Sequence, residues 1–213
     1  MTSTPTTDPA AWLEQARADV ARDPEAVTRA FAFAARKVGR EPLRPENDPA
    51  GVVHGTVDDA ARAELVVALA EHHGDPDELA DRLATLYHQG DAAERRGVLR
   101  GLDALTGRGQ VPPDVVAVGT ELAEDALRAN DQALVAAAVG PFGARHLDQH
   151  TWRHAVLKLV FLGVSLDAVA GLADRADGEL ARMAADFAAE RRAAGRPVPA
   201  DVGRLIPTDT TRE

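Results

Sequence analysis

A lysine stands inside an apolar run of this sequence, AVLKLVFLGVSL at residues 155–166. The chain contains 24 lysine and arginine residues, but Lys37 and Lys158 are its only lysines. A lysine kept among so many arginines indicates that position 158 needs an ammonium group. Burial disfavours the charged form of a lysine, so this side chain requires a carboxylate partner, a ligand or a chemical role. Lys158 is therefore the first residue at which to look for a site.

Three histidines precede Lys158 at intervals of four residues: His146, His150 and His154. On a continuous helix such residues lie along one stripe, and three imidazoles can bind zinc and leave one position open. Adjacent turns of one helix seldom place three rings around one ion, and Asp148 is expected to begin its helix after His146. We therefore interpret the histidines as polar residues on the wetter side of a mostly buried helix. A metal site at His146, His150 and His154 is the alternative.

The helix that carries Lys158 is predicted to begin at Asp148 and to be apolar on nearly all sides. Only the sector of His154 and Lys158 is polar, which favours a structural ion pair for the lysine over ligand binding, and ligand binding over covalent or acid–base chemistry. Trp152 is expected to fill the core, with the stacking of a flat ligand as the alternative. For Arg145, a capping role or a surface ion pair is favoured over recognition of a carboxylate.

These residues together form one candidate ligand- or partner-binding set, in which no residue is predicted to be catalytic. The set is Arg145, His146, Trp152, His154 and Lys158. The sequence has no glycine-rich phosphate loop, no nucleophile elbow and no HExxH metalloprotease motif, so no cofactor is predicted. Ser3 and Ser165 are the only serines, and neither lies in a nucleophile context.

The elements that must position this set are predicted to be helices. The sequence is rich in alanine, leucine, arginine and glutamate, and aromatic residues make up only 4% of it. Capping residues and apolar periodicity predict about nine helices, arranged in stacked antiparallel pairs as in a HEAT/ARM-like helical-repeat array. Residues 39–57, with three glycines and three prolines, are expected to form the longest surface loop. The predicted fold class is all-α.

Length and charge limit the domain organisation and the class of partner. Residues 10–206 are expected to form a single helical domain between a disordered N-terminus at residues 1–9 and a polar tail at residues 207–213. A net charge of -10 repels a phosphate backbone, so no nucleic-acid partner is expected. The absence of cysteine, of a secretory signal and of a membrane-spanning apolar run favours a cytoplasmic location.

Residues 91–205 resemble the EboA family of metabolite-traffic proteins. Three segments carry the resemblance: GDAAERRGVLRGL at residues 90–102, GPFGARHLDQHTWRHAVLKLVFLGVSL at residues 140–166, and DRADGELARMAADFAAERRAAGRPVPADVGRL at residues 174–205. The central segment, with Arg145, His146, Trp152 and the run around Lys158, is the most specific of the three. The alanine-rich first half of the chain is typical of many helical proteins.

The resemblance implies a bacterial, all-helical protein of secondary metabolism that works with partner proteins. These include a prenyltransferase-like membrane protein and sugar-phosphate-isomerase-like proteins, which together help a secondary-metabolite precursor to cross the cytoplasmic membrane. On this interpretation the chain is a non-catalytic adaptor or carrier, held at the inner face of that membrane by its partners. One alternative is an enzyme that uses Lys158 with His154 or His146 on a small molecule. The other is a purely structural helical scaffold.

Overall fold

A computed structural model describes residues 8–72 and 75–206, and within them the fold is all-α, as predicted. The α-helices are α1 (Pro9–Arg22), α2 (Ala26–Val38), α3 (Val57–His72), α4 (Pro76–Gln89), α5 (Ala92–Gly107), α6 (Pro113–Arg128), α7 (Gln132–Ala138), α8 (Pro141–His146), α9 (Gln149–Leu162), α10 (Leu172–Arg175) and α11 (Gly178–Ala193). Two short 3-10 helices, η1 (Leu166–Ala168) and η2 (Ala200–Arg204), complete the set. The predicted polar tail and all but two residues of the predicted disordered N-terminus lie outside the described residues.

The helices begin where short polar side chains accept hydrogen bonds from the first turn. The Asp148 carboxylate accepts from the Thr151 amide at 3.0 Å and so starts α9. At the start of α5, Asp91 and Glu94 each accept a hydrogen bond from the other's backbone amide and form a capping box. Aspartate caps of this kind fix most of the predicted helix starts.

Two short segments raise the number of helices above the expected nine. The kinked segment expected after Gly140 contains the six-residue helix α8. Proline fits the first position of this helix because a backbone amide there has no acceptor within the helix, so nothing is lost at Pro141. The single short helix expected over residues 165–173 is instead divided into η1 and α10. Gly171, with φ of 66°, adopts the left-handed conformation between them.

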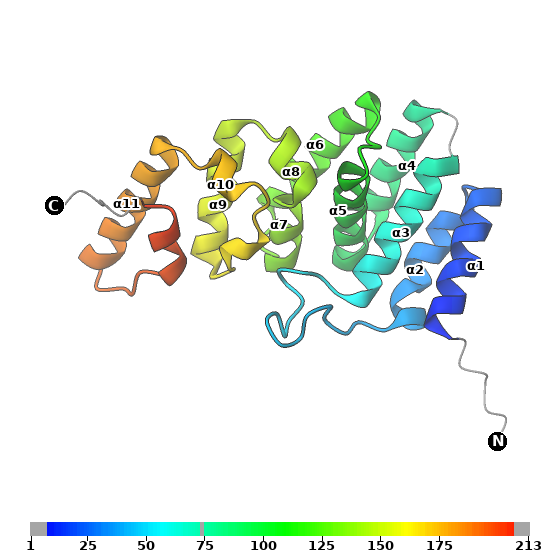
Figure 1. The fold of residues 1–213 in the computed structure, drawn as a ribbon, viewed down its shortest axis with the longest axis horizontal. Coiled ribbons are helices and arrows are strands. Elements are labelled where there is room, and N and C mark those ends of the chain that lie inside the picture. Colours follow the sequence, from blue (N-terminus) through cyan, green and yellow to red (C-terminus); the bar gives the residue numbers. More distant parts are fainter. Residues whose placement is uncertain (1–7, 73–74, 207–213) are drawn as a thin grey trace, which may run out of the picture.

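The helices stack along the chain into an elongated array, from α1 at one end to α11 at the other (Figure 1). Helix α3 packs on both α1 and α2, α5 packs on α3, and α6 packs on α4. Helices α7 and α8 then cover the far side of α5, and α9 packs on α7. Each helix pair therefore buries its apolar face against the next pair, as in helical-repeat proteins.

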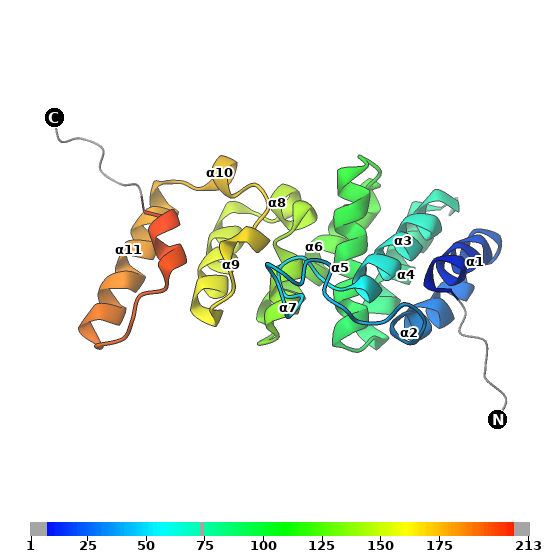
Figure 2. The same ribbon diagram turned by 60° about the horizontal axis from the view of Figure 1, so that its bottom comes forward.

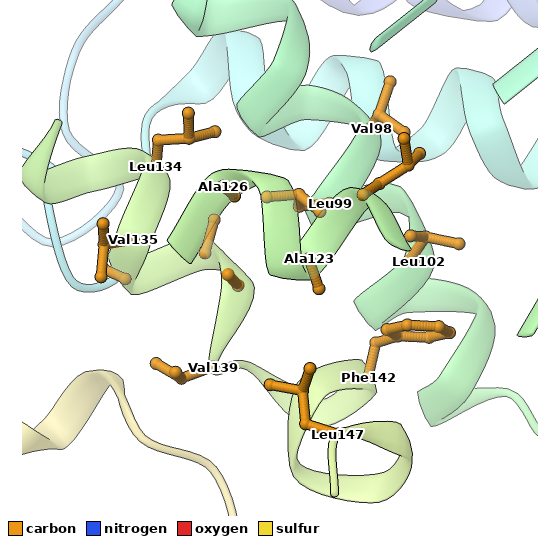
Figure 3. Close-up of a cluster of buried hydrophobic side chains, with 14 of the residues drawn as sticks. Val98, Leu99, Leu102, Ala123, Ala126, Leu134, Val135, Val139, Phe142 and Leu147 are labelled. Atoms are coloured by element: carbon orange, nitrogen blue, oxygen red, sulfur yellow. The ribbon is translucent and has the colours of Figure 1, made fainter. Parts of the chain in front are cut away.

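The core is continuous where α5, α6, α7 and α8 meet (Figure 3). The buried side chains there include Val98, Leu99, Leu102, Ala123, Ala126, Leu134, Val135, Val139, Phe142 and Leu147. Phe142 reaches this core because Gly119 of α6 leaves space for its ring: a Cβ at Gly119 would lie 2.5 Å from the ring atom Cζ. The core therefore anchors α8, which precedes the helix of Lys158.

The long segment between α2 and α3 passes beneath α5 towards α7 before it returns to α3 (Figure 2). The buried Asp48 carboxylate accepts hydrogen bonds from the amides of Val52, Val53 and His54 at 2.9, 2.9 and 2.7 Å. Arg100 of α5 donates to the Val53 carbonyl at 2.8 Å. This irregular segment, predicted as a surface loop, is therefore fixed to α5 by specific hydrogen bonds.

Candidate functional site

Lys158 on α9 binds the C-terminal end of α6. Its Nζ donates to the carbonyl oxygens of Leu127 and Ala129 at 2.6 and 2.7 Å, and Ala129 is the residue that ends α6. The last carbonyls of a helix lack partners within the helix and carry its partial negative charge, so they attract a cation. A carboxylate was the expected partner of Lys158. In the part of the chain that the structure describes, Lys158 binds these two carbonyls instead.

A second side-chain hydrogen bond joins the α6–α7 connection to α9. Here the donor lies on α7 and the acceptor on α9. Gln132, the first residue of α7, donates from Nε2 to the carbonyl of Leu162 at the end of α9, at 2.7 Å. The α6–α7 connection and α9 thus each satisfy backbone carbonyls of the other. The half-buried Lys158 is one of two residues that hold this junction together.

Trp152 lies in the core with no exposed surface, as its core-packing interpretation requires. The guanidinium of Arg175 lies 4.6 Å from its ring centroid, a cation–π contact. Arg175 also donates to the carbonyls of Ala144 and Leu147 at 2.7 and 2.9 Å, and burial lowers the pKa of Arg175 from its usual value. One face of the indole, where a flat ligand would stack, is thus covered by Arg175.

Arg145 and His146 lie at the end of α8, and their surroundings differ from those of Trp152 and Lys158. They line a small cavity of about 90 Å³ together with Thr106 and Val111. The His146 ring packs on Phe142 with 4.6 Å between ring centroids. Burial, with a smaller contribution from the positive charge of Arg145, lowers the pKa of His146 below its usual 6.5, which favours the neutral imidazole at pH 7.

The other two histidines of the alternative metal site are exposed on α9. Their rings, His150 and His154, lie 4.3 Å apart between centroids, and His154 Nδ1 lies 2.9 Å from the His150 carbonyl oxygen. His146 belongs to the separate helix α8. Among the described residues, no group of three histidine, aspartate or glutamate side chains could hold a metal ion, so the three histidines are not assembled into a site there.

The exposed side of α9 forms a continuous surface that we call the α9 stripe. It consists of His150, His154, Leu157 and Phe161. Spacings of four, three and four residues place these side chains on one face of the helix. Phe161 is 69% exposed, well above Phe33 at 38% and Leu43 at 45%, the other exposed large apolar side chains of the described residues. A strongly exposed aromatic residue on the same helix face as two histidines is typical of a protein-contact surface.

The most deeply buried polar network of the described residues links α3 to α5 and was not predicted from the sequence. Asp58 pairs with Arg62 at 2.5 Å, with side chains only 1% and 3% exposed, and Asp59 pairs with Arg96 at 2.7 Å. Thr56 donates to Asp58 at 2.6 Å, which ties the long loop to the same network. Asp58 precedes Arg62 by four residues in the sequence, a spacing that fits an ion pair within one helix.

Asp103 of α5 joins this region to α8. It accepts a hydrogen bond from the Phe142 amide at 2.9 Å and lies 3.6 Å from the Arg100 guanidinium. Burial raises the pKa of Asp103 to about 7, although the Arg100 charge acts in the opposite direction. A Cβ at Gly140 would clash with this carboxylate, so Asp103 and Gly140 together position the start of α8.

The geometry thus divides the predicted set in two. Lys158 and Trp152 are held by other parts of the protein, whereas Arg145, His146 and His154 retain surface that a ligand or partner can reach. Searching the described residues finds no helix long and apolar enough to cross a membrane.

No curated protein and no solved structure matches this chain. A family model does match, and it covers residues 1–207 of the 213-residue chain, including the first half that the sequence resemblance did not use. That model is described as metabolite traffic protein EboA. With a match over nearly its whole length, the chain belongs to the EboA family.

Proposed function

We propose that this protein is a non-catalytic adaptor or carrier that helps a secondary-metabolite precursor to cross the cytoplasmic membrane together with partner proteins. The observation that carries the proposal is the family match over residues 1–207, with its description as a metabolite traffic protein. A prenyltransferase-like membrane protein is the partner expected from the family resemblance. Through it the chain works at the inner face of the membrane.

The contacts of Lys158 support an adaptor over an enzyme that uses this lysine. Two of the three N–H donors of its ammonium group bind the carbonyls of Leu127 and Ala129. A base or a Schiff-base nucleophile must present a free amine to its substrate, whereas the Lys158 amine is occupied by these two carbonyls. The lysine that marks the most specific family segment is therefore assigned to fixing α9 on α6.

We assign the partner contact to the α9 stripe and its surroundings. The helix is held rigidly on its inner side by Lys158 and Trp152, so the stripe is presented in one fixed orientation. His154 lies within the stripe, while Arg145 and His146 line the small cavity at the end of α8. An apolar anchor with adaptable polar neighbours is the usual composition of an interface centre.

Affinity purification of the tagged protein from cells that also express its genomic neighbours tests this function. The solubilised membrane fraction should yield a membrane partner in fixed proportion to the bait. Phe161→Glu should reduce that recovery at least about tenfold, because it places a charge at the centre of the contact. Leu43→Glu is the matched control, since Leu43 is also an exposed apolar side chain but lies in the loop between α2 and α3.

The proposal is abandoned if neither a membrane partner nor a bound small molecule is recovered from repeated purifications. Equal loss of the partner with Phe161→Glu and Leu43→Glu would retain the adaptor function and remove the α9 stripe as its contact. Borohydride trapping of a carbonyl compound on Lys158 would replace the adaptor with an enzyme.

A further inference from the structure

A groove runs between α1 and α2 on the side of these helices away from α3. Its volume is about 570 Å³. The small side chains Ala16, Ala26 and Ala30 line it, and the aromatic residues Trp12 and Phe33 contribute to its wall. Helix α2 buries Val27, Phe31 and Ala34 on the neighbouring face of the helix, so the groove adjoins the core of the helix pair.

The groove has the shape of a packing site for one more helix. Within the array, α3 packs on both α1 and α2, and α5 packs on both α3 and α4. The outer side of the first pair carries no described element, since α1 lies at the end of the array (Figure 1). Alanine along both walls allows close approach of a helix backbone, as helix–helix packing requires.

The charges around the groove determine the chemistry of that helix. Arg29 and Arg36 lie 5.9 and 5.5 Å from the Phe33 ring centroid, and Lys37 lines the groove beside them. In the part of the chain that the structure describes, none of these three cations has an ion-pair partner. On the α1 side, by contrast, Arg22 is paired with Asp19. A cluster of unpaired cations in a chain of net charge -10 is complementary to carboxylates.

We propose that the α1–α2 groove binds an amphipathic helix of a partner protein, whose apolar face is edged by glutamate or aspartate residues on the side that meets α2. Its apolar face fills the space above the alanines and contacts Trp12 and Phe33. Its carboxylates pair with Arg29, Arg36 and Lys37. A flat anionic membrane fits this surface less well, because Asp19 and Asp23 on the other wall would repel it.

A charge-resolved peptide selection tests the proposal on the full-length protein. The probe is a display library of helical peptides with a fixed leucine and alanine face and with flanking positions randomised among glutamate, lysine and glutamine. Glutamate should become enriched along one flank only, and binding of the enriched peptides should weaken as salt concentration rises.

Two variants and one control then locate the binding surface. Ala30→Trp fills the groove and should abolish binding, and the double variant Arg29→Glu, Lys37→Glu should weaken it at least about tenfold. Ala185→Trp adds the same side chain to the exposed surface of α11 and should leave binding unchanged. Thermal unfolding followed by circular dichroism identifies any variant that fails to fold, and the charge-reversal variant leaves the apolar lining intact.

The selection has outcomes that overturn the proposal. These are no enrichment at all, enrichment of lysine, or binding that Ala30→Trp does not affect. Binding to phosphatidylglycerol vesicles that depends on Arg29 and Lys37, without selection of acidic peptides, would assign the groove to a membrane surface. A concentration-dependent dimer that Ala30→Trp disrupts would assign it to a second copy of the chain.

Discussion

Buried and half-buried cations serve different purposes in the two halves of this molecule. Between α3 and α5, Arg62 and Arg96 each bind a buried carboxylate. Between α6 and α10, Lys158 and Arg175 instead bind backbone carbonyls near helix ends. In the first region the Asp59–Arg96 pair joins two helices through full charges, and in the second region a side chain of one helix binds the end of another.

The difference has consequences for stability. Removing one member of a buried ion pair leaves an unpaired charge in a medium of low polarity, which is among the most destabilising changes known. Removing a cation from carbonyl groups leaves only partial charges without a partner, and water can reach them when the site is half-buried. The two halves are therefore expected to respond differently to the same kind of substitution.

Arg62→Met should produce the largest effect. It leaves the Asp58 carboxylate buried without its partner and removes a hydrogen bond to the Phe31 carbonyl, at a cost of about 3–5 kcal/mol in the free energy of unfolding. Urea denaturation measures this cost. The double variant Asp58→Leu, Arg62→Met is the control and should recover a large part of the loss. If the double variant is no more stable than the single one, the pair is not the cause.

Asp103→Asn should change the dependence of stability on pH. Burial raises the pKa of Asp103 from 3.8 to about 7, so between these values the folded protein holds a proton that the unfolded chain has released. The wild-type free energy of unfolding, minus that of the variant, should therefore fall as the pH rises from about 4 to about 7. At roughly 1.4 kcal/mol per pKa unit, the fall is at most roughly 4 kcal/mol.

Urea denaturation at several pH values measures this difference for Asp103→Asn. Asp186→Asn, at an exposed position on α11, is the control and should show no comparable trend over the same range. A wild-type stability that rises relative to Asp103→Asn over this interval would mean that the Arg100 charge outweighs burial at this carboxyl.

Lys158→Met should have an intermediate effect. The variant keeps an unbranched apolar chain but removes the donor from the Leu127 and Ala129 carbonyls, at a cost of about 1–3 kcal/mol. Amide hydrogen exchange should also become faster near the end of α6. Unchanged stability and exchange would remove the helix-end role of Lys158 and reopen a ligand or catalytic role.

Arg182→Ala should have the smallest effect. Its side chain is 60% exposed and pairs with Glu179 and Asp186 on the surface of α11. Exposed ion pairs of this kind contribute little to stability, and salt weakens them further. Denaturation of Arg182→Ala at low and high salt concentration checks this. A loss comparable with that of Arg62→Met would show that exposure does not explain the contrast between the two kinds of cation.

Much of the fold could be predicted from the sequence because its signals are local. Aspartate caps and apolar periodicity indicated the long helices. The sequence also predicted that Lys158 needs a partner, and the structure gives it two backbone carbonyls. The nature of that partner was not predictable, because a backbone carbonyl has no signature in the sequence. Arg175 was missed for the same reason: its acceptors on α8 and Trp152 on α9 are brought to it only by the fold.

The close approach of Gly140 to Asp103 has an evolutionary consequence. Any side chain at position 140 would enter the space that the Asp103 carboxylate fills. A relative of this protein with a larger residue there must therefore carry a different residue at position 103, or must place its carboxylate elsewhere. Substitutions at these two positions, 37 residues apart in the chain, are thus expected to occur together, and their joint variation in an alignment would divide the family into two groups.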